Sequence, residues 1–168
     1  MRITETRAAA DVDAAAQIWA EATAARDGED DVADLADSRP IIQRVLDCSP
    51  ESLLLLARSD HGLPLAFAAV EPVGDRVAEL TYFGVSPPLF GLGVGKELLR
   101  DLHRRLKAGG YLRAELSVYA DNLRATRLYE GLGWQPCGEP APHRKTGKPE
   151  QRYGLSLSAR GMWQKPII

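Results

Sequence analysis

Three glycines in the stretch FGLGVGK are the clearest candidates for chemistry, because they occupy alternate positions, 91, 93 and 95. They follow an apolar segment typical of a strand and precede a segment with helical periodicity. At such a turn the unpaired N–H groups and dipole of the helix start favour an anion, and a missing Cβ lets a phosphate oxygen reach the main chain. The stretch therefore predicts a diphosphate site. A tight turn that serves only helix-to-strand packing is the alternative.

Two other phosphate loops are excluded by the residues at one or two fixed positions of their motifs. A dinucleotide fingerprint GxGxxG starting at Gly91 needs glycine or alanine at position 96, where the chain has Lys96. A P-loop GxxxxGK[ST] aligned on Gly95 needs glycine at 90 and a hydroxyl at 97, but Phe90 and Glu97 stand there. Kinase and ATPase functions are therefore not expected.

Two further segments carry polar groups in apolar surroundings. On a helix beginning near Asn122, positions 122, 125 and 129 share one face, which aligns Asn122, Ala125 and Tyr129. In the strand-like segment AELTYFGV, alternation predicts Glu79, Thr81 and Phe83 on one face and Leu80 and Tyr82 on the other. Glu79 is thus a carboxylate within an apolar strand, and the alternative is that it merely begins the strand beside a solvated turn.

The overall composition is that of an ordinary globular protein. The 168 residues are 45% hydrophobic and 26% charged, which predicts a single domain over residues 1–168. A net charge of −2 gives no reason to expect nucleic acid or an anionic membrane as partner. Cys48 and Cys137 show no CxxC spacing, so no metal site is expected. No signal peptide or bilayer-spanning stretch is recognised, and the expected location is cytoplasmic.

The elements that must position these groups follow the order β-α-α-β-β-β-α-β-α-β-β. This order predicts a mixed sheet of six to seven strands with about four helices on its faces. The glycine turn lies between a strand and a helix, the usual ligand position in such a sheet. The best-defined segments are a strand at 2–7, helices at 11–26 and 41–47, a three-stranded meander within 52–85, a helix at 94–106, a strand at 112–120, a helix from 122 and a strand at 151–158.

Both motifs resemble signatures of the GNAT superfamily of N-acetyltransferases. LTYFGVSPPLFGLGVGKELL, residues 80–99, is similar to the family's strand, [Q/R]xxGx[G/A] loop and helix, and Phe83-Gly84-Val85-Ser86-Pro87 fills the slots ahead of the glycines. SVYADNLRATRLYEGLGW resembles the second signature, an Asn followed by AxxLYExxG[FW]. Together the motifs cover roughly residues 78–134. One departure is Phe90, which stands where the family usually has Gln or Arg.

The resemblance implies an α/β (α+β) fold with a mostly antiparallel sheet splayed between the fourth and fifth strands. It also implies acetyl-CoA as co-substrate, no metal, and direct acetyl transfer to the primary amine of a small molecule or peptide. Two alternatives stay open: a CoA-binding or regulatory module without turnover, and an acyltransferase that uses a longer acyl-CoA. The cofactor-binding residues that the resemblance implies are Phe83, Gly84, Val85, Phe90, Gly91, Leu92, Gly93, Val94, Gly95, Lys96, Asn122, Ala125 and Tyr129.

Catalytic roles follow from the same resemblance. Tyr129 is the implied general acid toward the departing thiolate, because a phenol and a thiol both have ordinary pKa values near ~10; a buried aromatic with a satisfied hydroxyl is the alternative. Glu79 stands six residues before Val85, where some members of the family place the general base, and an ammonium must lose a proton before it attacks. The N–H of Phe83 or Val85 is expected to polarise the thioester carbonyl.

The family commonly forms its acceptor pocket from two segments that here carry opposite charge. RDGEDDVADLAD is acidic and favours a cationic amine, whereas EPAPHRKTGKPE carries His143, Arg144, Lys145 and Lys148 and favours a carboxylate; both are also typical of solvated loops. The apolar tail has two open interpretations, cover for the core or contact with a second copy in a homodimer. Its apolar residues are Met162, Trp163, Ile167 and Ile168.

Overall fold

The computed structural model describes residues 1–158, so the tail residues Met162, Trp163, Ile167 and Ile168 lie outside the described residues. The chain forms one α/β domain with a seven-stranded mixed sheet and four α-helices, in the predicted order. The elements are β1 (Arg2–Glu5), α1 (Ala9–Asp27), α2 (Leu35–Cys48), β2 (Leu53–Arg58), β3 (Pro64–Gly74), β4 (Val77–Val85), the 3₁₀ turn η1 (Pro87–Leu89), α3 (Val94–Ala108), β5 (Arg113–Tyr119), α4 (Leu123–Glu130), β6 (Gln135–Pro142) and β7 (Pro149–Ser156).

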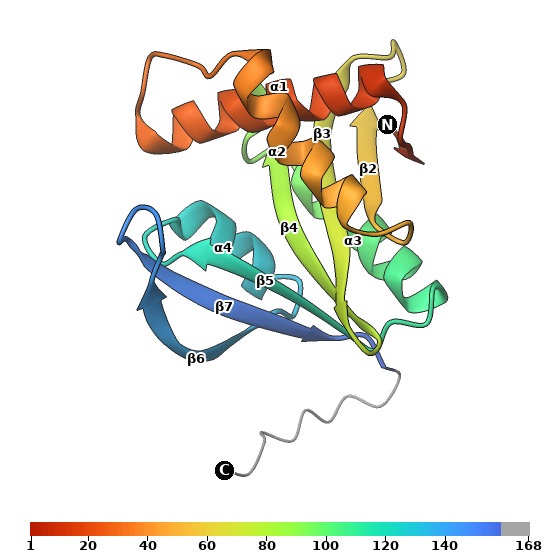
Figure 1. Ribbon diagram of the computed structural model, residues 1–168, viewed down its shortest axis with the longest axis vertical. Helices are drawn as coiled ribbons and strands as arrows, with labels where there is room; N and C mark the ends of the chain where they lie inside the picture. The colour runs from red at the N-terminus through yellow and green to blue at the C-terminus, as the bar shows by residue number, and fades with distance from the viewer. Residues whose placement is uncertain (159–168) are drawn as a thin grey trace.

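The sheet has the strand order β1-β2-β3-β4-β5-β7-β6, and only the β4–β5 pair is parallel. Two cores cover its faces. One packs α1 and α2 on β2 and β3, and the other packs α3 and α4 on the opposite face. In Figure 1, α1 and α2 lie in front of β3 and β4, while β5, β6 and β7 turn away from β4.

Helix α2 begins earlier than the sequence indicated. The predicted short helix at 41–47 extends from Leu35 to Cys48 and contains Pro40 in its second turn. Proline removes one helical hydrogen bond, but Pro40 and Ala36, whose carbonyl loses the bond, are both exposed to water. Burial of Ile42, Val45 and Leu46 against α1 and the sheet outweighs that loss.

Strand β6 occupies part of EPAPHRKTGKPE, residues 139–150, a segment whose sequence is typical of a solvated loop. Residues 139–142 belong to β6 and residues 149–150 to β7, so the loop between them is only 143–148. Proline is tolerated in β6 because β6 is an edge strand whose outer side needs no ladder hydrogen bonds.

A β-bulge in β4 overturns the predicted alternation. Ala69 pairs with Tyr82 and Val70 pairs with Leu80, which leaves Thr81 as an extra residue. Consequently Leu80 and Phe83 lie in the same core with α3, whereas Tyr82 packs on the α1 side. The expectation that Glu79 and Phe83 share a face is therefore wrong, because the bulge shifts the register between them.

Gly84 explains how α1 approaches β4. A Cβ added at Gly84 would lie 2.7 Å from Cε1 of Phe67 and 3.3 Å from Cγ2 of Ile18, a residue of α1. The ring of Phe67 is fully buried and has no room to move aside. Gly84 therefore sets the distance between α1 and the strand that lines the functional site.

We expect Gly84→Ala to lower the free energy of unfolding by about 1–3 kcal/mol, because the added methyl overpacks this contact. Gly74→Ala is the matched control, since its Cβ would meet only Val77, at 3.9 Å. Chemical denaturation of both variants checks the prediction, and equal stabilities would contradict it.

Candidate functional site

The strands β4 and β5 pair only at their beginnings. The parallel register joins Val77 with Arg113, Ala78 with Ala114 and Glu79 with Glu115, and it ends there. Beyond Glu79 and Glu115 the two strands diverge, as Figure 1 shows. The splay predicted between the fourth and fifth strands is confirmed, and it opens the sheet next to the glycine turn.

Main-chain donors of β4 point into this opening. N–H groups alternate in direction along a strand, and the N–H of Ser86 donates to the carbonyl of Leu65 (2.9 Å) on the β3 side. The N–H groups of Phe83 and Val85 must then point to the opposite side, where β5 no longer pairs. Two backbone donors are thus available at the divergence of the strands.

The glycine turn supplies a second set of backbone donors. The first helical bond of α3 runs from the N–H of Glu97 to the carbonyl of Gly93 (3.0 Å), which leaves the N–H groups of Val94, Gly95 and Lys96 without acceptors inside the helix. The N–H groups of Phe90 and Leu92 donate within the turn, to Pro87 and Leu89, and so do not belong to this set.

The glycines of the turn serve two purposes. Gly91 and Gly93 have φ values of 78° and 87°, and an added Cβ would meet nothing within 4 Å, so the surface above them is open to a ligand. At Gly95 an added Cβ would lie 3.1 Å from Phe83 and from Val85 and 3.4 Å from Leu128. Gly95 therefore also fits the alternative interpretation, in which glycine permits close packing of the helix on the strand.

Helix α4 places its motif residues on the α3 side of the sheet. Asn122 is the N-cap rather than a helical residue, and its Oδ1 accepts a hydrogen bond from the N–H of Ala125 (3.3 Å). The Nδ2 of its amide stays available as a donor.

Tyr129 is 6% exposed, and its ring packs against Phe83 and Trp134 at centroid distances of 6.2 and 5.9 Å. Its hydroxyl makes no hydrogen bond to any other residue within 1–158. Burial raises the pKa of Tyr129 above its ordinary value, so the phenol carries its proton at neutral pH, but the match with the thiol that the ordinary pKa values predict is not retained. Phe83, whose own N–H faces the opening between the strands, links Tyr129 to that opening.

Glu79 is the last residue of β4 that pairs with β5, and its side chain lies on the α1 side of the sheet. Its side chain is 24% exposed, and Arg152 of β7 reaches it at 3.7 Å while pairing with Glu115 at 2.6 Å. Burial is the largest cause that raises the pKa of Glu79 above its ordinary value; Arg152 opposes the rise, and the neighbouring carboxylate of Glu71 adds to it. Glu79 is therefore a carboxylate poised to accept a proton nearer neutral pH than an exposed glutamate.

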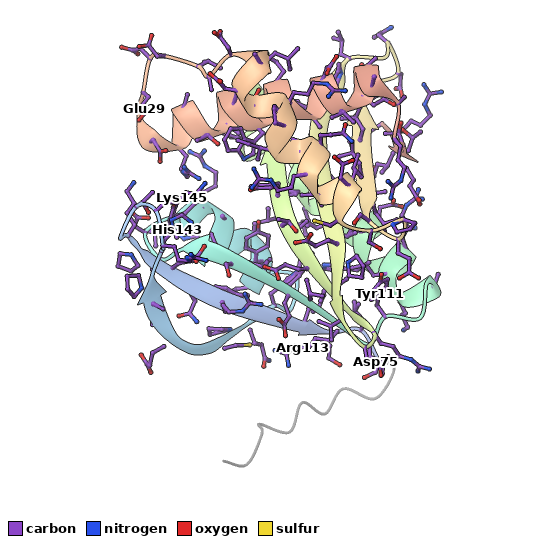
Figure 2. All side chains as sticks on the ribbon, in the orientation of Figure 1. Glu29, Asp75, Tyr111, Arg113, His143 and Lys145 are labelled. Atoms are coloured by element: carbon purple, nitrogen blue, oxygen red, sulfur yellow. The ribbon has the colours of Figure 1, made fainter. Side chains whose placement is uncertain are left out.

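The structure brings the acidic and basic segments together above the end of β5. The carboxylate of Asp27 lies 3.9 Å from Nζ of Lys148, and the guanidinium of Arg26 lies 5.0 Å from the ring centroid of Tyr119. The Tyr119 hydroxyl is 3.4 Å from Nδ1 of His143. Figure 2 shows Glu29 of the acidic segment and the hairpin residues His143 and Lys145 at the same end of the molecule.

A pocket of about 220 Å³ opens between α1 and the acidic segment. Trp19 and Ala24 give it an apolar wall, and Glu29 and Asp31 are also among its lining residues. The ring of Trp19 meets Tyr82 of β4 edge-on at 6.1 Å, so the pocket borders the strand that carries Glu79.

Sequence reasoning missed two cations of the site. Arg152 balances Glu79 and Glu115, and strand alternation in QRYGLS would have placed it on their face had the strand neighbours been known. Arg124 of α4 lies over the ring of Phe90, with its Cζ 4.2 Å from the ring centroid. Nothing in the spacing of two residues so far apart in the chain signals that contact.

Two further findings on the described residues concern metal binding and membrane crossing. Among residues 1–158, no three His, Cys, Asp or Glu side chains gather closely enough to hold a metal ion. Within the same residues, no helix has the length and apolar character needed to cross a bilayer.

Comparisons with known proteins agree with this geometry. Residues 13–134 match the model of the Acetyltransferase (GNAT) family. The chain is 48% identical over 84 residues to a mycothiol acetyltransferase of Kineococcus radiotolerans, covering 49% of this chain and 26% of that protein. It is 32% identical over 95 residues to an uncharacterized N-acetyltransferase of Schizosaccharomyces pombe, covering 56% of this chain and 58% of that one. The chain thus spans between about a quarter and three fifths of these relatives.

Solved structures show the same fold. The ribosomal-protein-S18-alanine N-acetyltransferase from Escherichia coli superposes with a TM-score of 0.75 at 22% identity, covering 99% of this chain and 98% of that chain. An aminoglycoside 6'-N-acetyltransferase complexed with coenzyme A superposes with a TM-score of 0.74 at 15% identity, covering 95% and 99%. At these identities the likeness concerns the fold alone.

Substitutions can separate the two roles of the Asn122 amide, in which Oδ1 caps α4 and Nδ2 is an available donor. We expect Asn122→Ala to lower the free energy of unfolding by about 1 kcal/mol, because α4 loses its cap. Asn122→Asp keeps the capping oxygen and should retain stability, yet it removes the Nδ2 donor and should weaken CoA binding. Thermal unfolding and calorimetry with CoA check both effects. Unchanged CoA affinity in Asn122→Asp would restrict Asn122 to capping.

Proposed function

The chain belongs to the GNAT acetyltransferase family, and from this premise we propose that it transfers an acetyl group from acetyl-CoA to the primary amine of a small molecule or peptide. The observation that carries the proposal is the divergence of β4 and β5. It places free backbone donors between a carboxylate on one face of the sheet and a protonated phenol on the other. We place the reaction in the cytoplasm and assign it to a single domain over residues 1–168.

The residues present fit acetyl-CoA as co-substrate. The open surface above Gly91 and Gly93 and the free N–H groups of Val94, Gly95 and Lys96 suit its diphosphate. The pantetheine arm then enters the opening between the strands beside Ala125, where Nδ2 of Asn122 is available to its amides. When bound, acetyl-CoA supplies an activated thioester.

The protein residues then have separate tasks. Glu79 accepts a proton from the acceptor ammonium, directly or through water, so that the amine nitrogen can form its new bond to the acetyl carbon. The N–H groups of Phe83 and Val85 stabilise the negative charge that develops on the carbonyl oxygen. Tyr129 donates its proton to the sulfur as the carbon–sulfur bond breaks. The second proton that the nitrogen loses returns through water to the Tyr129 phenolate, and Glu79 releases its proton to solvent. The products are an amide and CoA thiol.

The charges on the α1 side favour an acceptor amine that arrives protonated. The carboxylates of Glu71, Glu79 and Glu115 share this face, and Glu29 and Asp31 line the pocket between α1 and the acidic segment. One relative is a mycothiol acetyltransferase, and the other is described as an N-acetyltransferase, which is consistent with an amine acceptor.

Thiol release with a panel of amines tests the proposal. Amine-dependent release of CoA from acetyl-CoA supports it. If saturating acetyl-CoA gives no such release but CoA raises the melting temperature, the alternative of a CoA-binding module without turnover replaces it. Propionyl-CoA and succinyl-CoA, assayed in parallel, test the second alternative of a longer acyl donor.

The ion pair between Arg152 and Glu79 predicts a pH effect. Activity requires ionised Glu79, so kcat/KM should fall as the pH drops through the pKa of Glu79. Arg152→Met removes the cation that lowers this pKa, so the acid limb of the pH profile should move to higher pH. The amine itself titrates equally in all variants, so the difference between variants reports on Glu79.

Arg104→Met is a matched control for this profile, because Arg104 pairs with Asp101 on the exposed side of α3. In Arg104→Met the acid limb should be unchanged. In Glu79→Gln the part of the acid limb that arises from titration of Glu79 should disappear. A profile of Arg152→Met that overlays that of the parent protein would remove Glu79 as the base.

Removal of the Tyr129 hydroxyl should slow the chemical step. We expect Tyr129→Phe to lower kcat by about 100-fold while changing KM for acetyl-CoA much less, because the proton is donated only in the transition state. The variant keeps the ring contacts with Phe83 and Trp134, so it should fold normally. Steady-state kinetics measure the effect, and unchanged turnover would exclude Tyr129 from the mechanism.

A further inference from the structure

The diphosphate turn of this chain lacks the side-chain donor that opens the family motif, because Phe90 occupies that position. The guanidinium of Arg124 lies over the Phe90 ring at 4.2 Å. Resting on the function proposed above, we infer that Arg124 replaces the missing donor and binds the diphosphate of CoA, with Phe90 as its positioning platform.

The electrostatic setting of Arg124 supports this role. Arg124 lies in the first turn of α4, where the helix dipole repels a cation. Within residues 1–158 no ion pair joins it to a carboxylate, and its guanidinium instead contacts the ring of Phe90. The helix dipole repels this exposed guanidinium, and no carboxylate neutralises it. Binding of an anion at this position would therefore relieve an unfavourable charge.

The first turn of α4 meets the residue just ahead of the glycine turn through the contact of Arg124 with Phe90. Phe90 immediately precedes the glycine turn, and a Cβ at Gly95 in the first turn of α3 would lie 3.4 Å from Leu128 of α4. The free N–H groups of α3 and the guanidinium of Arg124 therefore border the same surface. Their combined positive charge suits a group with two negative charges better than a single carboxylate.

The stacked geometry leaves the guanidinium ready to bind. A cation–π contact uses the face of the guanidinium, while its N–H donors lie in the plane and stay free for phosphate oxygens. The ring thus reduces the side-chain freedom that is lost on binding. An arginine held in this way donates two parallel hydrogen bonds to a phosphate, which lysine cannot do.

Calorimetry with CoA, 3′-dephospho-CoA and pantetheine tests the inference. Arg124→Ala should weaken CoA and 3′-dephospho-CoA equally, by about tenfold or more, and leave pantetheine unaffected. Arg127→Ala is the control, because Arg127 is also exposed and lies one turn further along α4. A loss confined to CoA would move Arg124 to the 3′-phosphate and overturn the diphosphate assignment.

A rescue experiment tests the replacement itself. Phe90→Gln in the Arg124→Ala background installs the family's amide donor and should recover most of the lost CoA affinity. Arg124→Lys should recover only part of it. Failure of both to bind better than Arg124→Ala would overturn the inference.

The outcomes separate this inference from the proposed function. If the parent protein binds CoA and Arg124→Ala binds it equally well, only the role of Arg124 fails. If the parent protein binds no CoA, the proposed function and this inference fail together. Circular dichroism and melting temperatures of all variants establish that the affinities refer to folded protein.

Discussion

The rest of the site depends on the end of hydrogen bonding between β4 and β5 at Glu79 and Glu115. A central strand normally satisfies its N–H groups on both sides, and an unpaired buried donor costs free energy comparable to a lost hydrogen bond. The N–H groups of Phe83 and Val85 therefore need water or a ligand as acceptor. In the proposed function, the carbonyl oxygens of the thioester arm would serve as these acceptors. The interruption of the sheet thus leaves two donors available to a ligand.

The bulge at Thr81 distributes the proposed catalytic groups over both faces of the sheet. Without the extra residue, Phe83 would point to the same side as Glu79, away from Tyr129. With it, Phe83 packs on Tyr129 beside α3, and Glu79 lies on the α1 side of the sheet next to Arg152. A proton acceptor on one face and a proton donor on the other match a reaction in which the nucleophile and the leaving group occupy different sides of the carbonyl.

Local sequence patterns predicted most of the fold, because they depend on features that one segment carries alone. Helix periodicity located α3 from Val94, and the alternating runs located the meander. The predicted alternation in β4 failed at Thr81 because the bulge depends on the pairing of β4 with β3. The predicted start of α2 was too late because tertiary burial of Ile42 outweighs the helix-breaking tendency of Pro40. The contact of Arg124 with Phe90 joins segments whose proximity only the folded chain creates.

The net charge of −2 conceals a separation of charge that suits the proposed reaction. The starts of α3 and α4, together with Lys96 and Arg124, concentrate positive potential where the phosphates of CoA are expected. The α1 side carries the carboxylates of Glu71, Glu79 and Glu115; Arg152 lies between the latter two, and Arg113 also pairs with Glu115 at 2.8 Å. In the proposed reaction, an anionic donor and a cationic acceptor would approach from different sides of one opening. The sheet keeps the two charged regions apart, and we propose that their ligands meet at the gap between β4 and β5.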